Sequence, residues 1–129
     1  MNIVEKAKKV KLLIMDVDGV LTDGRIILDD RGRELKFFDV KDGHGIALAH
    51  RAGLPTAIMA FIGDDLIDIP LLKKVGFSIA VADALPYVKD AADMVTEKKG
   101  GRGAVRDAIE FILDAKGLWK KIYREYVKN

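Results

Sequence analysis

The chain contains no cysteine among its 129 residues. This absence excludes disulfide bonds, thiolate metal sites and cysteine nucleophiles, and it fits a reducing cytoplasm, which is the location we expect. No apolar run approaches the roughly 18 residues that span a membrane. The charged N-terminus lacks the apolar core of a signal peptide, so the sequence predicts no membrane partner.

Excess charge of either sign is also small. The 22 basic and 20 acidic residues give a net charge of +2, and acids and bases are interspersed. Aromatic residues make up only 7% of the chain and do not interleave with a basic stripe, which argues against a nucleic-acid partner. Half of the residues are apolar, so a chain of this length can bury its own core, and we expect a single domain over residues 1–129.

Short apolar runs alternate with segments of helical periodicity. This alternation predicts a Rossmann-like α/β fold, with a parallel sheet and helices on both of its faces. A β-hairpin over 25–38 would follow the first strand directly. The C-terminal tail over 118–129 carries apolar and aromatic side chains at helical spacing, which favours core packing or a subunit contact. These residues are Trp119, Ile122, Tyr123 and Tyr126. We expect strands at 10–15, 25–29, 34–38, 54–65, 77–82 and 93–96, and helices at 43–52, 66–75, 86–91 and 104–116.

Two carboxylates follow the first expected strand. Asp16 and Asp18 precede Gly19, and their side chains converge beyond the end of the strand, where open α/β sheets bind ligands. An EF-hand loop is excluded, because Val20 and Leu21 stand where it needs a third acid and a glycine. Two acids with no neighbouring base predict a bound cation, and we interpret the segment as a magnesium-assisted phosphoryl-transfer site.

A second group of acids supports this interpretation. Asp64, Asp65 and Asp68 follow another strand-like run, and a plain polar turn after the first strand would not explain them. Two strand ends that bring carboxylates to one rim form the hard oxygen site that magnesium prefers, with positions left for a substrate phosphate. Because such a site does not call for imidazole, we interpret His44 and His50 as helix residues.

Gly100–Gly103 precedes the helix expected at 104–116. Two interpretations stay open for this glycine-rich segment. Its backbone N–H groups and Arg102 could hold an anion at the start of the helix, or it could be a flexible loop.

Five motifs occur along the chain up to about residue 119: LLIMDVDGVLTDG, FFDVKDGHGI, GDDLIDIP, SIAVADALPYVKDAAD and GGRGAVR. In this order they resemble the haloacid dehalogenase superfamily of phosphohydrolases, and within it the 3-deoxy-D-manno-octulosonate 8-phosphate (KDO 8-P) phosphatase branch. The resemblance implies a cap-less fold, magnesium as cofactor and a small acidic sugar phosphate of lipopolysaccharide precursor synthesis as substrate. It also implies a homotetramer, with the hairpin packed against neighbouring subunits.

The resemblance also implies a role for each matching acid. Asp16 would be the nucleophile that forms an aspartyl-phosphate, and Asp18 would protonate the leaving group and then activate water. Asp16, the backbone carbonyl of Asp18, and Asp64 would hold magnesium, which neutralises charge in the transition state. Asp65 and Asp68 would orient these ligands.

A further set of residues would contact the sugar acid. In the family the C-terminal segment, which here contains Arg102, reaches the active site of a neighbouring subunit. The resemblance therefore implies that this segment contacts an anion there. The residues that match the family's substrate contacts are Asp18, Asp39, Val40, Lys41, Asp42, Gly43 and Arg102.

The chain departs from the family between residues 58 and 62. At this place the family carries a further βα segment with a Ser or Thr that positions the phosphoryl group and a lysine that binds it. Ile58–Ile62 runs straight through instead, which predicts a shortened sheet and a very poor catalyst. An alternative follows: a deletion variant that binds metal and anions, or serves assembly, without turnover. A response-regulator receiver domain uses similar acids but would need its phosphorylated Asp on a middle strand.

Overall fold

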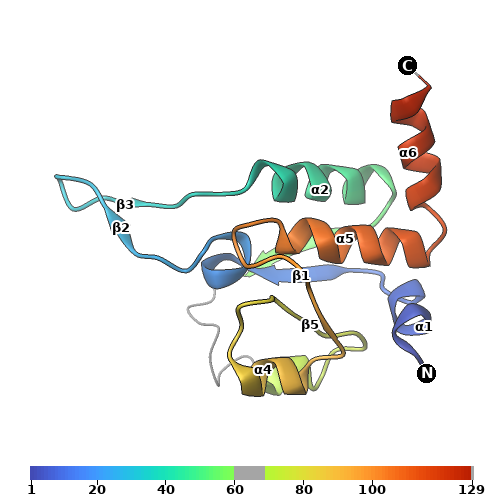
Figure 1. Ribbon diagram of the computed structural model, residues 1–129, viewed down its shortest axis with the longest axis horizontal. Coiled ribbons are helices and arrows are strands. Elements are labelled where there is room, and N and C mark those ends of the chain that lie inside the picture. Colours follow the sequence, from blue (N-terminus) through green and yellow to red (C-terminus); the bar gives the residue numbers. More distant parts are fainter. Residues whose placement is uncertain (60–68, 129) are drawn as a thin grey trace.

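The structure is a computed structural model that describes residues 1–59 and 69–128 (Figure 1). The expected strand beyond residue 59 and the start of the expected helix at 66 lie outside the described residues. In chain order the elements are α1 (Ile3–Lys8), β1 (Leu13–Asp16), the wide turn η1 (Val17–Leu21), β2 (Ile27–Leu28), β3 (Glu34–Leu35), α2 (Val40–Arg51), β4 (Thr56–Met59), α3 (Ile69–Leu72), β5 (Ile79–Ala80), α4 (Pro86–Ala91), β6 (Met94–Val95), α5 (Ala104–Ala115) and α6 (Trp119–Val127).

The helices agree with expectation better than the strands do. Those expected at 86–91 and 104–116 are confirmed as α4 and α5. Helix α2 begins at Val40, three residues earlier than expected, because the Asp39 carboxylate caps it and accepts the Lys41 amide at 2.7 Å. Helix α1 was not expected, although Asn2 and Glu5 form a capping box that marks its start.

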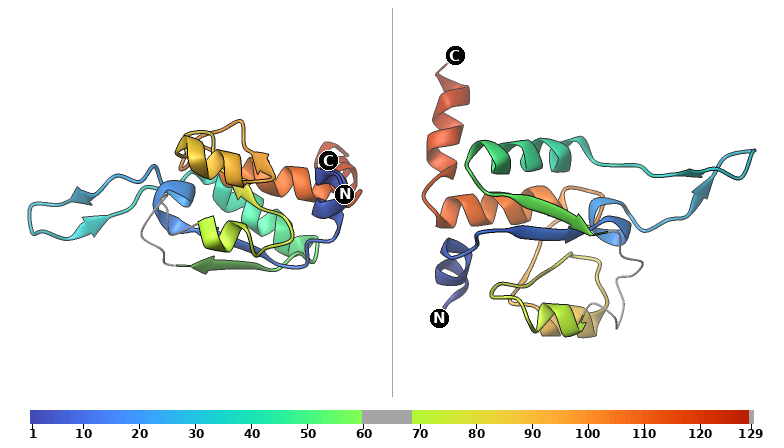
Figure 2. Two further views of the ribbon diagram at one scale, coloured as in Figure 1. Left: turned by 90° about the horizontal axis from the view of Figure 1, so that it is seen from below. Right: turned by 180° about the vertical axis from the view of Figure 1, so that it is seen from behind.

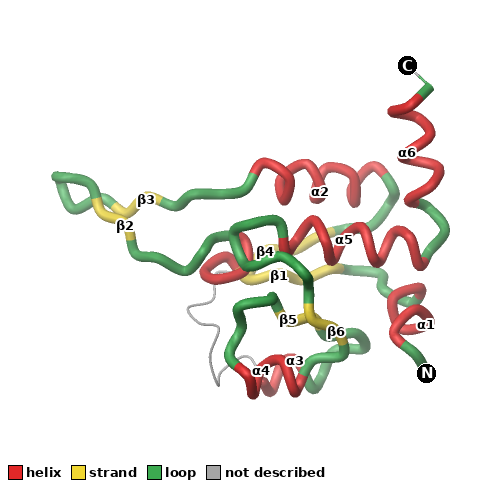
Figure 3. The backbone as a smooth tube through the Cα atoms, viewed as in Figure 1, coloured by secondary structure: helices red, strands yellow, loops and turns green. Residues whose placement is uncertain are grey.

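Three two-stranded sheets are formed by the described residues. Strands β1 and β4 pair in parallel, with Leu13 opposite Thr56, and β5 pairs in parallel with β6 (Figure 3). The chain passes from β1 through the β2–β3 hairpin and α2 into β4, which is the crossover that parallel neighbours require. The expected hairpin is confirmed, and Gly32 takes the left-handed conformation (φ +75°) in its turn. Parallel α/β architecture is confirmed.

The main core lies between the β1–β4 pair and two helices, α2 and α5 (Figure 2). Leu48, Ile109, Ile112 and Leu113 are its largest fully buried side chains. A smaller cluster joins β5, α4 and the start of α5. The side chain of Ile14 points away from the main core and is 42% exposed, and it lines an apolar cavity of about 690 Å³ between β1 and β5.

Helix α6 packs against the rest of the chain. Ile122 is buried, the Arg106 guanidinium lies over the Trp119 ring, and the Tyr126 hydroxyl accepts a hydrogen bond from Arg51 at 3.0 Å. This confirms packing for Trp119 and Ile122, whereas Tyr123 and Tyr126 are more than half exposed. None of the described helices has the length and apolar character needed to cross a membrane.

Helices α2 and α5 meet at a buried carboxylate. Asp42 is 1% exposed, and its Oδ1 accepts the backbone N–H of Arg106 at 2.8 Å. Helix α5 has Gly103 at its N-cap and no side-chain cap of its own, so Asp42 supplies the missing acceptor from a neighbouring helix. Burial raises the pKa of Asp42, although the Arg106 amide acts in the opposite direction.

Replacing Asp42 by asparagine tests this account. A carboxyl group whose pKa is raised in the folded state favours folding when protonated. Its contribution is therefore present below the ordinary pKa of 3.8 and is lost as pH rises through the raised value. The wild type should therefore lose free energy of unfolding as pH rises through this window, whereas Asp42→Asn has no carboxyl group at this position to ionise. We expect the difference in stability to shift in favour of Asp42→Asn. Urea denaturation at several pH values measures the difference, and a difference independent of pH would contradict the account.

Candidate active site

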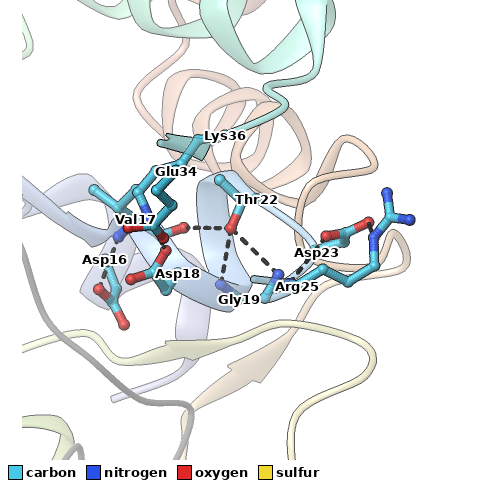
Figure 4. Close-up of polar contacts among 10 residues, drawn as sticks. Asp16, Val17, Asp18, Gly19, Thr22, Asp23, Arg25, Glu34 and Lys36 are labelled. Carbon is cyan, nitrogen blue, oxygen red and sulfur yellow. Dashed lines mark hydrogen bonds and ion pairs between the residues drawn. The ribbon is translucent and has the colours of Figure 1, made fainter. Parts of the chain in front are cut away.

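The two carboxylates of the first motif lie where β1 ends and the backbone turns (Figure 4). Asp16 is the last residue of β1, and its Oδ1 accepts the Val17 amide at 2.7 Å. Asp18 follows in extended conformation, and Gly19 then takes φ +84°, a conformation that favours glycine. The sequence motif therefore forms the turn η1, which presents both acids at the carboxyl end of the strand.

Thr22 holds this turn closed. Its hydroxyl is buried, accepts the amides of Gly19 at 3.3 Å and Gly24 at 3.2 Å, and donates to the carbonyl of Val17 at 3.3 Å. Sequence reasoning did not assign this residue a role. A threonine three residues after an aspartate–glycine pair is the signal that could have identified it, since threonine hydroxyls close such turns.

The glycine-rich loop packs directly on the same turn. A Cβ atom on Gly100 would lie 1.7 Å from the carbonyl oxygen of Gly19, so only glycine fits. The Gly100 amide donates to Asp83, and the Gly101 amide donates to the Val20 carbonyl. These two amides therefore have partners within the chain. The loop is a packing element, and the exposed side chain of Arg102 is what it offers to a ligand.

Lys36 brings a positive charge to the acids. It follows β3, and its Nζ lies 2.7 Å from Asp18 Oδ1 and 3.0 Å from Glu34 Oε1 (Figure 4). These two carboxylates, Asp18 first, raise the pKa of Lys36, so its ammonium stays charged. Sequence reasoning missed this contact, because Lys36 and Asp18 are 18 residues apart and only the hairpin brings them together.

A polar cleft of about 330 Å³ lies beside this turn. Asp39, Val40, Lys41 and Arg102 from the predicted contact set line it. Its other lining residues are Asp23, Arg25, Phe37, Phe38 and Gly101.

Not every predicted contact reaches the cleft. Asp42 is buried against α5 and Gly43 lies on α2, so neither is among the residues that line it. Within the cleft, the backbone amide and guanidinium of Arg25 hold the pKa of Asp23 below its ordinary value. The cleft thus combines three cationic side chains, Arg25, Lys41 and Arg102, and Arg25 is already paired with Asp23.

The second group of acids predicted to bind magnesium follows the described part of β4 in sequence. Asp64, Asp65 and Asp68 lie outside the described residues. Within the described part of the chain, no three histidine or acidic side chains gather as a metal site. Among the described residues, Asp16 and Asp18 bring two carboxylates to one turn. This donor set fits magnesium, which binds through one or two carboxylates and completes its coordination with water and phosphate.

Comparison with known proteins identifies the family. Haloacid dehalogenase-like hydrolases match residues 43–109. The 3-deoxy-D-manno-octulosonate 8-phosphate phosphatase KdsC of Escherichia coli (strain K12) is 37% identical over 161 residues, which covers 90% of this chain and 86% of that protein. The chain therefore belongs to the haloacid dehalogenase-like hydrolases, and the resemblance stated from its motifs is confirmed.

Solved structures give the same result. A probable YrbI-family phosphatase from Pseudomonas syringae superposes with a TM-score of 0.93 at 30% identity, covering 98% of both chains. KDO 8-P phosphatase from Moraxella catarrhalis, solved with magnesium ion, phosphate ion and KDO, gives a TM-score of 0.89 at 28% identity, covering 96% of this chain and 97% of that one. The haloacid dehalogenase-type fold is thus confirmed.

This chain is shorter than KdsC, as the missing segment between residues 58 and 62 predicts. The alignment with KdsC extends over 161 residues, whereas this chain has 129, so KdsC carries at least the difference, 32 residues, without counterpart here. This agrees with the expectation that the chain lacks about one βαβ unit of the family.

Replacing Thr22 tests the construction of the turn. Thr22→Val keeps the shape of the side chain but leaves the amides of Gly19 and Gly24 without their acceptor, and we expect a loss of about 1–3 kcal/mol in the free energy of unfolding. Thr22→Ser, which keeps the hydroxyl, is the matched control and should lose less. Chemical denaturation measures both, and equal stabilities of the two variants would show that the hydroxyl does not hold the turn.

Proposed function

We propose that the chain is a magnesium-dependent phosphomonoester hydrolase that converts KDO 8-phosphate to KDO and phosphate. The observation that carries the proposal is the placement of Asp16 and Asp18 together at the end of β1, beside a cleft with cationic side chains. The 37% identity to a KDO 8-P phosphatase supports the choice of substrate.

The proposed reaction has two steps. A carboxylate oxygen of Asp16 attacks phosphorus, the bond to the sugar oxygen breaks, and the Asp18 carboxylic acid protonates that departing oxygen to give the sugar hydroxyl. The Asp18 carboxylate then removes a proton from water, which attacks the aspartyl-phosphate and releases inorganic phosphate. The Val17 amide at 2.7 Å fixes the Asp16 side chain for the attack.

Magnesium would be held by Asp16, the backbone carbonyl of Asp18, and Asp64, with Asp65 and Asp68 orienting these ligands. When bound, it offsets the repulsion between the anionic nucleophile and the anionic phosphate.

The sugar-acid end of the substrate would lie in the polar cleft. Lys41 and Arg102 supply positive charge for a carboxylate there, and Val40, 86% exposed, supplies apolar surface. Asp39 and Gly43 belong to the start of α2, which presents these groups. Asp42 supports the same wall from behind, because its buried carboxylate joins α2 to α5.

We also propose that the chain forms a homotetramer through its hairpin. The β2–β3 arm extends away from the rest of the molecule in Figure 1 and carries apolar side chains that the monomer leaves uncovered. Ile26 is 80% exposed, and such surface on one arm is typical of a protein–protein contact. The exposed apolar residues of the arm are Ile26, Leu28, Leu35, Phe37 and Phe38.

A second function is favoured by the shortage of at least 32 residues relative to KdsC. Under this alternative the chain binds metal and anions, or serves assembly, without turnover. The two functions differ in one measurable respect, the release of inorganic phosphate.

A phosphate-release assay separates them. We expect the wild type to release phosphate from KDO 8-phosphate slowly, with magnesium required, because the segment with the family's Ser or Thr and lysine is absent. Asp16→Asn should lose at least about 10³-fold more in kcat because the nucleophile is gone. Lys73→Ala, on an exposed residue after α3, is the control and should match the wild type. Magnesium and phosphate binding without release from any of a panel of sugar phosphates would establish the alternative. Full activity of Asp16→Asn would remove the nucleophile assignment.

The tetramer has its own test. We expect sedimentation to give four times the mass of one chain for the wild type and a smaller mass for Ile26→Asp with Leu28→Asp, because charges on the arm oppose its burial. Arg31→Ala, at the polar tip of the hairpin, is the matched control and should stay tetrameric. A monomeric wild type would contradict this proposal and leave the catalytic one unaffected.

A further inference from the structure

Lys36 occupies a position that neither the motifs nor the proposed mechanism uses. Its ammonium lies 2.7 Å from Asp18 and its side chain is 33% exposed, so it is in contact with the acidic turn and is still reachable by a ligand. Among the ion pairs of the described residues, this is the one that joins a basic side chain to the Asp16–Asp18 turn.

The hairpin fixes the position of this ammonium. Leu35, the neighbour of Lys36 in sequence, pairs with Ile27 across the two strands, so the backbone that leads into Lys36 is held in register. Glu34 contacts the ammonium at 3.0 Å and restrains it from a second direction. Lys36 is therefore held by two carboxylates from two different elements, rather than extended freely into solvent.

The other basic side chains near the site lie in the polar cleft rather than against Asp18. Arg25 pairs with Asp23 at 2.6 Å, and Arg102 lies 3.8 Å from the same carboxylate. Both line the polar cleft with Lys41, and Lys36 is not among the residues that line it. Arg25, Lys41 and Arg102 thus place their positive charge in the cleft, whereas Lys36 places its charge on the acidic turn.

Charge balance explains why this division matters. A phosphate monoester that reaches Asp16 brings negative charge to a turn that already holds the Asp16 carboxylate, and like charges at such separations repel. A fixed cation at the point where charge concentrates lowers this repulsion without reorganisation at the moment of reaction. An ammonium ion is a compact charge with three donors, so it can contact Asp18 and a phosphoryl oxygen at the same time.

We propose that Lys36 is the phosphate-clamping cation of this chain, bound to Asp18 at rest and to a phosphoryl oxygen when a phosphate occupies the turn. The inference rests on the proposed function for the identity of the site, and it extends that function by assigning the phosphate contact to the hairpin. The hairpin then has two tasks, assembly and the supply of a residue to the site.

Binding of inorganic phosphate in the presence of magnesium tests the inference apart from turnover. We expect Lys36→Ala to weaken the Kd for phosphate at least about tenfold, because it removes the charged contact. Lys36→Arg should recover part of the affinity, and Arg31→Ala on the same hairpin should equal the wild type. Calorimetric titration with phosphate measures all four proteins. Magnesium titration in the absence of phosphate should give Lys36→Ala an affinity no weaker than that of the wild type, which shows that its turn is intact.

Turnover provides the second measurement. For KDO 8-phosphate we expect Lys36→Ala to lose about 10²–10³-fold in kcat/KM. Phosphate affinity and turnover both unchanged in Lys36→Ala would overturn the inference and leave the proposed function standing. A wild type that binds phosphate through Lys36 yet releases none from any sugar phosphate would overturn the proposed function and support the inference. A wild type that binds no phosphate at all would overturn both.

Discussion

The backbone of Gly100 lies against the backbone of Gly19, with no space for a side chain between them. This contact joins the turn that carries the two acids to the loop that starts α5, and α5 in turn is joined to α2 by Asp42. The acids at the end of β1 and the cleft beside them are therefore joined by one continuous set of contacts, one between two backbones and one between a backbone amide and the Asp42 carboxylate. Rigid elements of this kind are what a phosphoryl-transfer site needs, since its catalysis depends on position and charge.

Local patterns in the sequence predicted the local features of this structure. Helix α5 was predictable because its apolar residues repeat along one face, and the hairpin because a glycine stands in its turn. Strands β1, β2, β3, β5 and β6 are shorter than predicted, because apolar runs do not reveal where backbone pairing stops. The acids at the end of β1 were predictable as a pair. Lys36 was not, because its contact with Asp18 depends on the path of the hairpin.

Two residues had functions in the structure that differ from those suggested by their chemical type. Asp42 belongs to a charged segment at the start of a helix, where carboxylates are usually exposed, yet it is buried as a cap for a second helix. Gly100 belongs to a segment typical of anion-binding loops, yet its amide donates to Asp83. In both cases the partner comes from a distant part of the chain. A single sequence contains no signal for such partners, and only the fold brings them together.

The apolar cavity beside β1 has a thermodynamic consequence. The chain leaves Ile14 and Leu12 partly exposed along this strand, so folding removes less apolar surface from water than in a domain of equal length with a closed core. The heat-capacity change of unfolding scales with the apolar surface that unfolding exposes. The stability of this protein will therefore vary with temperature along a flatter curve, and its unfolding will respond less steeply to denaturant.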